Sequence, residues 1–158
     1  MINVEQHRKL IVRPVLEHLG MYSLAAENLI IGTAAHESRL EYLAQIKGPA
    51  LGVYQCEPAT HQDIWDEYLA YRADLASKVR ALASQHWFEQ NPDRELIGNL
   101  PYATAICRIH YRRIKQPLPA PDDLWGLANY WKAHYNTALG RGTVEQFYNH
   151  YPTEKDHY

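Results

Sequence analysis

The segment His36-Glu37-Ser38 contains the strongest candidate for a catalytic side chain. Glu37 follows a strongly apolar run and precedes a glycine-containing stretch, so it can be held by a rigid helix and still face a cleft. Apolar neighbours and the negative end of the helix dipole both favour the protonated carboxyl group. A glutamic acid protonated near neutral pH suits the general acid of glycosidic-bond cleavage. The alternative is a solvated carboxylate at a helix end.

Two other chemistries are considered for the same segment and rejected. His36-Glu37 resembles the start of the zinc-protease helix motif, but Leu40 stands where the second histidine would be needed. Because the remaining histidines form no recognisable ligand pattern, we expect no metal and no other cofactor. Ser38 lacks the flanking glycines of a nucleophile elbow, so it is a poor nucleophile candidate.

Gly140-Arg141-Gly142-Thr143 precedes a short amphipathic segment and could suggest a phosphate-binding loop. The full glycine spacing and the following lysine of such loops are missing, so a turn with a helix cap is the better interpretation.

The aromatic residues are mostly of the kind that carries a polar group. The chain has 12 tyrosines and 4 tryptophans but 2 phenylalanines, which suits contacts with sugar faces and hydroxyl groups. Core packing with hydrogen-bonded tips explains this composition equally well.

The element that must position Glu37 is a helix from Leu24 to about Ser38, capped by Ser23 and too apolar for a surface helix. Before it, helical spacing predicts a helix or helix pair from Val4 to Leu19, capped or kinked by Pro14. After it, Glu41 to Glu57 lacks a helical period and predicts a loop or short strands.

The second half of the chain also predicts helices. One begins at Pro58 and continues through Leu75, with a break before Val79 to Phe88. Another begins near Asn99 and Pro101 and ends near Ile114. Three prolines then form a connector, after which Asp122 or Asp123 caps a helix through Tyr135. Thr143 and Gln146 have capping-box spacing for a last helix, Val144 to about His150. The fold class expected is mainly α.

Bulk properties narrow the classes of partner. A chain of 158 residues is the usual size of one domain, and a formal charge of -2 at pH 7 gives no reason to expect nucleic acid binding. We interpret Arg112 and Arg113 as a solvated helix face. Residues Met1 to Leu19 lack a secretion-signal pattern, and no apolar run approaches a membrane span. Cys56 and Cys107 are expected to be buried thiols, with a single disulfide as the alternative.

Three segments, in this order, resemble motifs of the lysozyme-like superfamily of lytic transglycosylases and goose-type lysozymes. Glu37-Ser38 matches the catalytic Glu-Ser pair of that superfamily. Gly52-Val53-Tyr54-Gln55 and Pro58-Ala59-Thr60 resemble its Gly-Leu-Met-Gln stretch and the Pro-x-Thr of its next helix. Tyr135-Asn136 resembles its third motif, Ala-Tyr-Asn-x-Gly. The resemblance covers Ile30 to Tyr151, and the chain looks most like the small versions of this domain in tailed bacteriophages.

The resemblance implies a single compact lysozyme-like domain over residues 1–158, with a small loop or short-strand region after the catalytic helix. It implies cleavage of peptidoglycan between N-acetylmuramic acid and N-acetylglucosamine, with Glu37 as acid and then base. The substrate-binding residues that it implies are Ser38, Tyr54, Gln55, Tyr135 and Asn136. The partners would be peptidoglycan and other virion or tail proteins of a phage. The protein would be part of the virion, or would be made in the host cytoplasm and delivered to the wall.

Departures from the family pattern leave three alternatives to the favoured interpretation. Val53-Tyr54 replaces Leu-Met, and Thr137-Ala138 follows Asn136. The favoured interpretation is a lytic transglycosylase, which needs one carboxylate. A lysozyme-type hydrolase would use a second one, for which Asp63, Glu41 and Glu57 are candidates. The other two alternatives are a structural or wall-binding virion protein with weak or no catalysis, and a helical adaptor unrelated to glycans.

Overall fold

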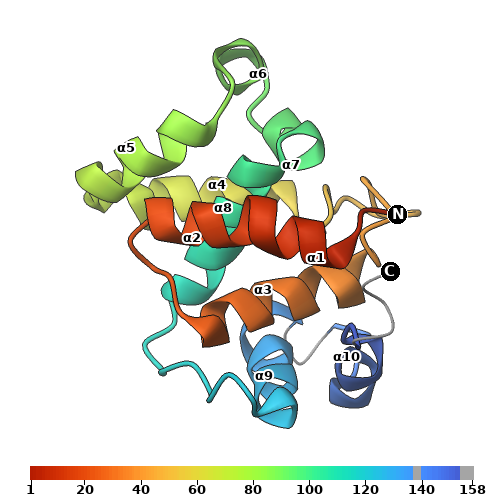
Figure 1. The fold of residues 1–158 in the computed structure, drawn as a ribbon. Helices are drawn as coiled ribbons and strands as arrows, with labels where there is room; N and C mark the ends of the chain where they lie inside the picture. The colour runs from red at the N-terminus through yellow and green to blue at the C-terminus, as the bar shows by residue number, and fades with distance from the viewer. Residues whose placement is uncertain (137–139, 154–158) are drawn as a thin grey trace.

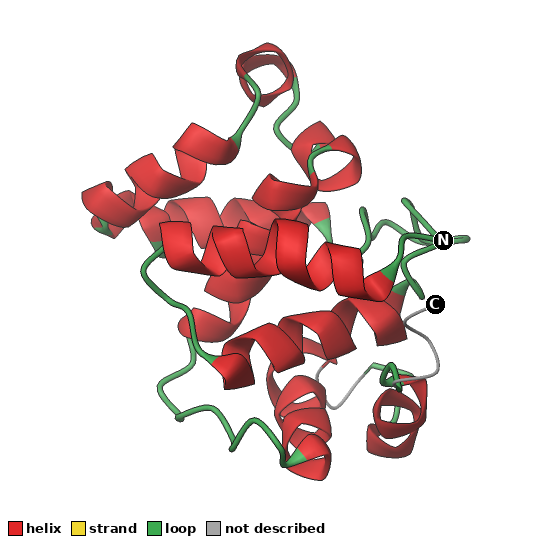
Figure 2. Cartoon of the chain, in the orientation of Figure 1, coloured by secondary structure: helices red, strands yellow, loops and turns green. Residues whose placement is uncertain are grey.

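The computed structural model describes residues 1–136 and 140–153, which are mainly helical and contain no sheet, as the sequence predicts (Figures 1 and 2). In chain order the helical elements are α1 (Val4–His7), the π-helix η1 (Arg8–Val12), α2 (Arg13–His18), α3 (Leu24–Glu37), α4 (Pro58–Glu67), the 3-10 helix η2 (Leu69–Tyr71), α5 (Ala73–Leu82), α6 (Gln85–Gln90), α7 (Arg94–Gly98), α8 (Leu100–Arg112), α9 (Leu124–Trp131), the π-helix η3 (Lys132–Asn136) and α10 (Val144–His150).

The N-terminal elements form one helical run with a widened turn in its middle. In η1 the Arg13 N–H donates to the carbonyl oxygen of Arg8, five residues earlier. Pro14 follows immediately and has no N–H to donate, which is a common cause of such a local distortion. The predicted kink at Pro14 is therefore a π-type turn within a continuous run.

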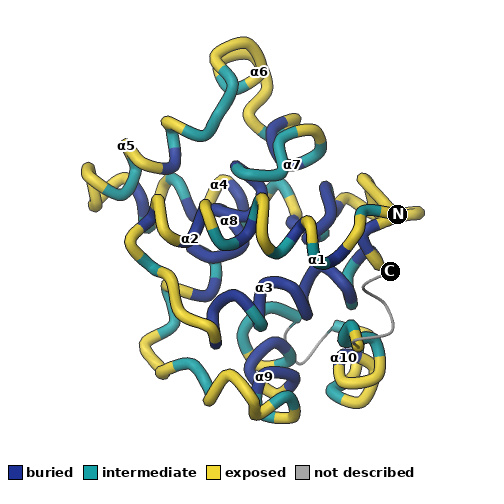
Figure 3. The backbone as a smooth tube through the Cα atoms, viewed as in Figure 1, coloured by how far each residue is buried: buried dark blue, intermediate teal, exposed yellow. Residues whose placement is uncertain are grey.

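Helix α3 lies in the middle of the molecule, as predicted. Its N-terminus is capped by Ser23, whose Oγ accepts a hydrogen bond from the Ala26 N–H at 3.0 Å. The α1–α2 run lies along one side of it and α9 and α10 along the other, so most of α3 is buried (Figures 1 and 3). Gly32 allows the close approach of α10, because a Cβ there would lie 2.4 Å from the Phe147 ring.

The stretch after α3 is a loop with two isolated antiparallel bridges, Ala44 to Leu51 and Leu51 to Cys56, in agreement with the predicted loop or short strands. The loop folds back onto α7 at Gly52, which has a φ of 75°. A Cβ at this position would lie 1.9 Å from the carbonyl oxygen of Leu96. Only glycine combines this backbone conformation with this contact.

The region from Pro58 to Gly98 is more broken than the sequence indicates. The predicted long helix divides into α4, η2 and α5, and α7 was not predicted at all. Helix α8 packs against both halves of the core, with Cys107 and Tyr111 in one apolar cluster and Ile106 and Ile109 in the other. Both cysteines are buried free thiols, so the disulfide alternative is wrong.

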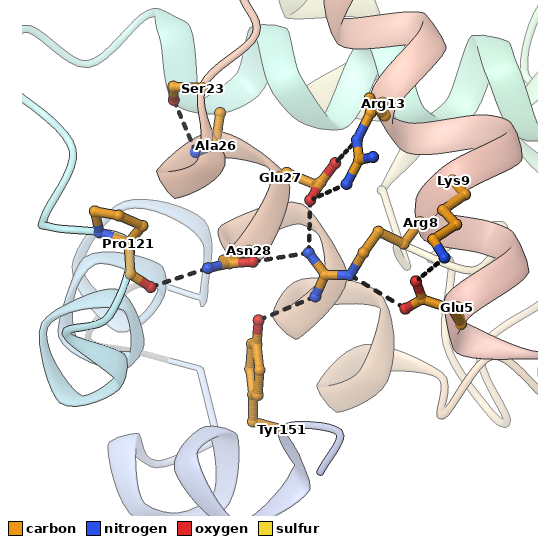
Figure 4. A network of polar contacts seen from close by, with 10 residues as sticks. All are labelled: Glu5, Arg8, Lys9, Arg13, Ser23, Ala26, Glu27, Asn28, Pro121 and Tyr151. Atoms are coloured by element: carbon orange, nitrogen blue, oxygen red, sulfur yellow. Dashed lines mark hydrogen bonds and ion pairs between the residues drawn. The ribbon is translucent and has the colours of Figure 1, made fainter. Parts of the chain in front are cut away.

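A buried ionic network fixes the α1–α2 run onto α3 (Figure 4). The Glu27 side chain is fully buried, and its carboxylate accepts hydrogen bonds from Arg8 Nη1 at 2.8 Å and from Arg13 Nε at 2.7 Å. Arg8 also donates to Asn28 Oδ1 at 2.8 Å and to the Tyr151 hydroxyl at 3.4 Å. The network therefore joins the N-terminal run, α3 and the segment after α10.

We expect Gly52→Ala to lower the free energy of unfolding by about 3 kcal/mol, because the new methyl group meets a carbonyl oxygen and the backbone must keep a positive φ. Gly98→Ala is the matched control, since a Cβ there meets nothing within 4 Å. Urea denaturation measures both. Equal effects of the two substitutions would contradict the contact described here.

We expect Glu27→Gln to cost about 3 to 5 kcal/mol, because it leaves two guanidinium groups without their buried countercharge. Glu17→Gln removes the same charge at an exposed position of α2 and serves as the control. A loss as small as that of the control would show that the network contributes nothing to stability.

Candidate active site

Glu37 is the last residue of α3, and its carboxyl group is mostly buried. Burial raises its pKa to about 7, and a hydrogen bond from Trp131 Nε1 to Oε1 at 3.0 Å opposes this rise. The desolvation expected from the sequence is therefore present. A carboxyl group with this pKa can donate a proton near neutral pH and take one back.

A cavity of about 730 Å³ opens beside this carboxyl group. Four of the residues that the sequence predicted for a site line it together: Glu37, Gln55, Tyr135 and Asn136. They come from the end of α3, the 38–57 loop and η3. The fold therefore brings together residues that lie up to 99 positions apart in the sequence.

Gln55 is held by its own loop. Its backbone has a φ of 49°, its N–H donates to the carbonyl oxygen of Gly52 at 3.0 Å, and its side-chain Nε2 donates to the same oxygen at 2.9 Å. The side-chain carbonyl oxygen of Gln55 has no protein partner among the described residues. It can accept a hydrogen bond from a ligand in the cavity.

Tyr135 lines the cavity and is hydrogen-bonded to the loop. Its ring stacks on His110 and Tyr111 at centroid distances of 4.5 and 5.2 Å. Its hydroxyl donates to the carbonyl oxygen of Tyr54 at 2.6 Å. Because a phenol has one proton, this bond uses the only proton of the Tyr135 hydroxyl.

Asn136 is oriented by Lys132, one turn earlier in η3. Lys132 Nζ donates to Asn136 Oδ1 at 2.6 Å and to the carbonyl oxygens of Gly140 and Gly142 at 2.9 and 2.7 Å. All three ammonium protons are thus used to hold η3 against the glycine turn. Asn136 Nδ2 has no hydrogen-bond partner among residues 1–136 and 140–153, so it can donate to a ligand. Thr137 and Ala138, where the sequence departs from the family pattern, lie outside the described residues.

The structure corrects the positions expected for Ser38 and Tyr54, whose side chains do not line the cavity. Ser38 is buried, and its Oγ donates to the carbonyl oxygen of Val53 at 2.6 Å. The Tyr54 side chain points into the core, where its hydroxyl contacts His7 at 2.9 Å and Thr104 at 2.8 Å. Within the Gly52-Val53-Tyr54-Gln55 stretch of the described loop, only Gln55 lines the cavity.

His36 also lines the cavity, although the sequence did not single it out as a binding residue. Its Nδ1 lies 3.0 Å from His150 Nδ1, and its ring meets Trp131 edge-on at a centroid distance of 4.4 Å. Burial lowers the pKa of His36 to about 4, so the ring is neutral at pH 7. Among residues 1–136 and 140–153, no group of three histidine, cysteine, aspartate or glutamate side chains could hold a metal ion.

Trp131 and Lys132 were missed as site residues, although a signal for both exists in the sequence. Each precedes a predicted site residue, Tyr135 or Asn136, by four positions, which places it on the same helical face. Of the three candidate second carboxylates, Glu57 lines the cavity and is exposed. Asp63 and Glu41 are exposed and do not line it.

Comparisons with known proteins identify no relative: no family model, no curated protein and no solved structure matches this chain. No helix in the described part of the chain is long and apolar enough to cross a membrane. The site must therefore be interpreted from its own chemistry.

We expect Glu37→Gln to stabilise the protein at high pH and to change little at low pH. The pKa of about 7 lies above the ordinary 4.5, so the folded state retains a proton that the unfolded state releases, and stability falls as pH rises from about 4.5 to 7. The variant cannot ionise. It should gain up to about 3 kcal/mol at about pH 8 and nothing at about pH 4.

Urea denaturation at both pH values measures this difference. Glu41→Gln, at an exposed loop position, is the control and should show no such pH dependence. A gain for Glu37→Gln that is the same at both pH values would show that Glu37 ionises normally.

Proposed function

We propose that this chain cleaves the glycan strand of peptidoglycan by a lytic transglycosylase mechanism, with Glu37 as general acid and base. The observation that carries the proposal is a carboxyl group with a pKa of about 7 at a large cavity that Gln55, Tyr135 and Asn136 also line. The motif resemblance supplies the substrate class. It is also the basis for proposing a role in the wall degradation of a tailed phage.

In the first step, protonated Glu37 donates its proton to the glycosidic oxygen between N-acetylmuramic acid and N-acetylglucosamine. The bond from that oxygen to C1 of the muramic acid breaks, and positive charge develops on the sugar ring. The departing N-acetylglucosamine keeps the proton as its hydroxyl. Glu37 is left as a carboxylate, to which the Trp131 N–H donates.

In the second step, the Glu37 carboxylate takes a proton from the 6-hydroxyl of the same muramic acid. The freed oxygen forms a bond to C1, which closes a 1,6-anhydro ring and restores protonated Glu37. This route requires one carboxyl group. It fits a site in which Glu37 is the mostly buried carboxyl and neighbouring His36 is neutral.

The polar atoms of the site that have no hydrogen-bond partner among the described residues suit an N-acetyl group. Asn136 Nδ2 can donate to its carbonyl oxygen, and the side-chain oxygen of Gln55 can accept from its N–H.

A hydrolase is the second candidate, and Glu57 is the observation that favours it. This exposed carboxylate lines the same cavity as Glu37 and could position a water molecule. The convergence of Glu37, Gln55 and Tyr135 weighs against the helical adaptor, which needs no such cavity. A wall-binding virion protein without turnover would use the same cavity and is separated from the enzyme only by an assay.

Wild-type protein and the Glu37→Gln and Glu57→Gln variants should be incubated with peptidoglycan sacculi, and the soluble products identified by mass spectrometry. We expect wild type to release 1,6-anhydro-muropeptides and Glu37→Gln to lose at least about 100-fold in rate, since it cannot donate a proton. Glu57→Gln should retain most of the activity.

Two other outcomes would contradict the transglycosylase proposal. Reducing-end products that disappear in Glu57→Gln would assign the chain as a hydrolase. If folded wild type binds sacculi but releases no more than Glu37→Gln, the enzyme proposal fails and a wall-binding protein remains.

A further inference from the structure

A second, smaller cavity of about 270 Å³ lies at the C-terminal end of α8. Helix α8, the proline-containing connector and α9 enclose it, in the region where the cyan connector leaves α8 (Figure 1). Its polar lining includes Arg108, Arg112, Lys115 and Gln116, and Tyr111 and Leu118 contribute apolar walls. It shares no lining residue with the Glu37 cavity.

The charges of this cavity, the Arg108 pocket, are unbalanced. Of the residues that the structure describes, three cationic side chains line it and no carboxylate does. Arg108 is 8% exposed, and its Nε is buried with no hydrogen-bond partner. Burial, and secondarily the charge of Arg112, lowers the pKa of Arg108. A guanidinium group stays charged in a protein, so Arg108 is a buried cation without a countercharge.

Elsewhere the same chain neutralises a buried charge fully. The guanidinium of Arg8 contacts Glu27, Asn28 and the Tyr151 hydroxyl in the network of Figure 4. Arg108 has no comparable partner among the described residues. An unpaired buried guanidinium that lines a cavity is the arrangement expected where the countercharge comes from a ligand.

The shape of the pocket limits what that ligand can be. The Tyr130 hydroxyl donates to the carbonyl oxygen of Gln116 at 2.9 Å and so holds the connector against α9. Arg108 lies deep, while Arg112 and Lys115 are exposed at the rim. The volume suits a small molecule rather than a polymer chain.

We propose that the Arg108 pocket binds a small organic oxyanion, a phosphomonoester or a carboxylate, through Arg108 at its base and Arg112 and Lys115 at its rim. A guanidinium group binds either oxyanion through two parallel hydrogen bonds. The proposal is independent of glycan cleavage, because the two cavities are separate.

The test is a titration of the full chain with inorganic phosphate or with acetate, at constant ionic strength. The arginine Nε–Hε signals are followed by NMR. We expect the Arg108 signal to move and to saturate with one of these anions. Arg113 Nε is the internal reference, since it is also buried and unpartnered but does not line the pocket. No saturation at Arg108 with either anion, or an equal shift at Arg113, overturns the proposal.

The two probes also separate the ligand classes, because saturation by phosphate alone assigns a phosphomonoester and saturation by acetate alone assigns a carboxylate. Arg112→Gln, at the exposed rim, should weaken binding about tenfold. Lys78→Gln removes the same charge at an exposed position of α5 and should leave the affinity unchanged. Equal weakening by both variants would mean a response to net charge only, and would overturn the proposal. Glu37→Gln should bind the anion like wild type.

Discussion

The burial of helix α3 is the constraint on which the rest of the structure depends. The helix carries two glutamates ten positions apart, and the fold treats them in opposite ways. Glu27 meets two guanidinium groups, from Arg8 and Arg13, whereas Glu37 meets an indole N–H from Trp131 and no cation in the described part of the chain. A carboxyl group removed from water without a countercharge favours its protonated form. The same helix is thus anchored ionically near one end and carries a proton donor at the other.

The backbone at Val53 and Tyr54 is the second organising feature, because both sides of the Glu37 cavity attach to it. Ser38 donates to the carbonyl oxygen of Val53 just beyond the end of α3, and Tyr135 donates to that of Tyr54 from η3. These two short hydrogen bonds connect three segments that are far apart in sequence. The loop can present Gln55 to the cavity because Gly52 lets it pack directly against the backbone of α7.

The two cavities differ in the ionisable groups that line them: the Glu37 cavity has Glu37, Glu57 and Arg141, whereas the Arg108 pocket has three cations. The Glu37 cavity is built to keep a proton on a carboxyl group near neutral pH, with neutral histidine beside it. The Arg108 pocket exposes an unneutralised guanidinium group to a small, partly apolar space. The buried ring of Tyr111 separates them, packing on Tyr135 on one side and on Tyr130 on the other. Helix α8 lines the first cavity with His110 and the second with Arg108 and Arg112.

The sequence alone determined the helix ends that a capping residue or the end of an apolar run marks. Ser23 and Thr143 cap helices where their spacing predicts, and Glu37 ends an apolar helix. Local rules suffice there because a cap depends on residues within one turn. The breaks from α4 to α6 were not predictable, since residues 59–90 contain no proline or glycine, whereas Pro92 lies at the break between α6 and α7. The directions of Ser38 and Tyr54, and the partners of Trp131 and Lys132, were decided by the tertiary structure alone. Which face of a loop or helix meets a cavity depends on contacts with segments distant in sequence, and a motif read along the chain does not contain them.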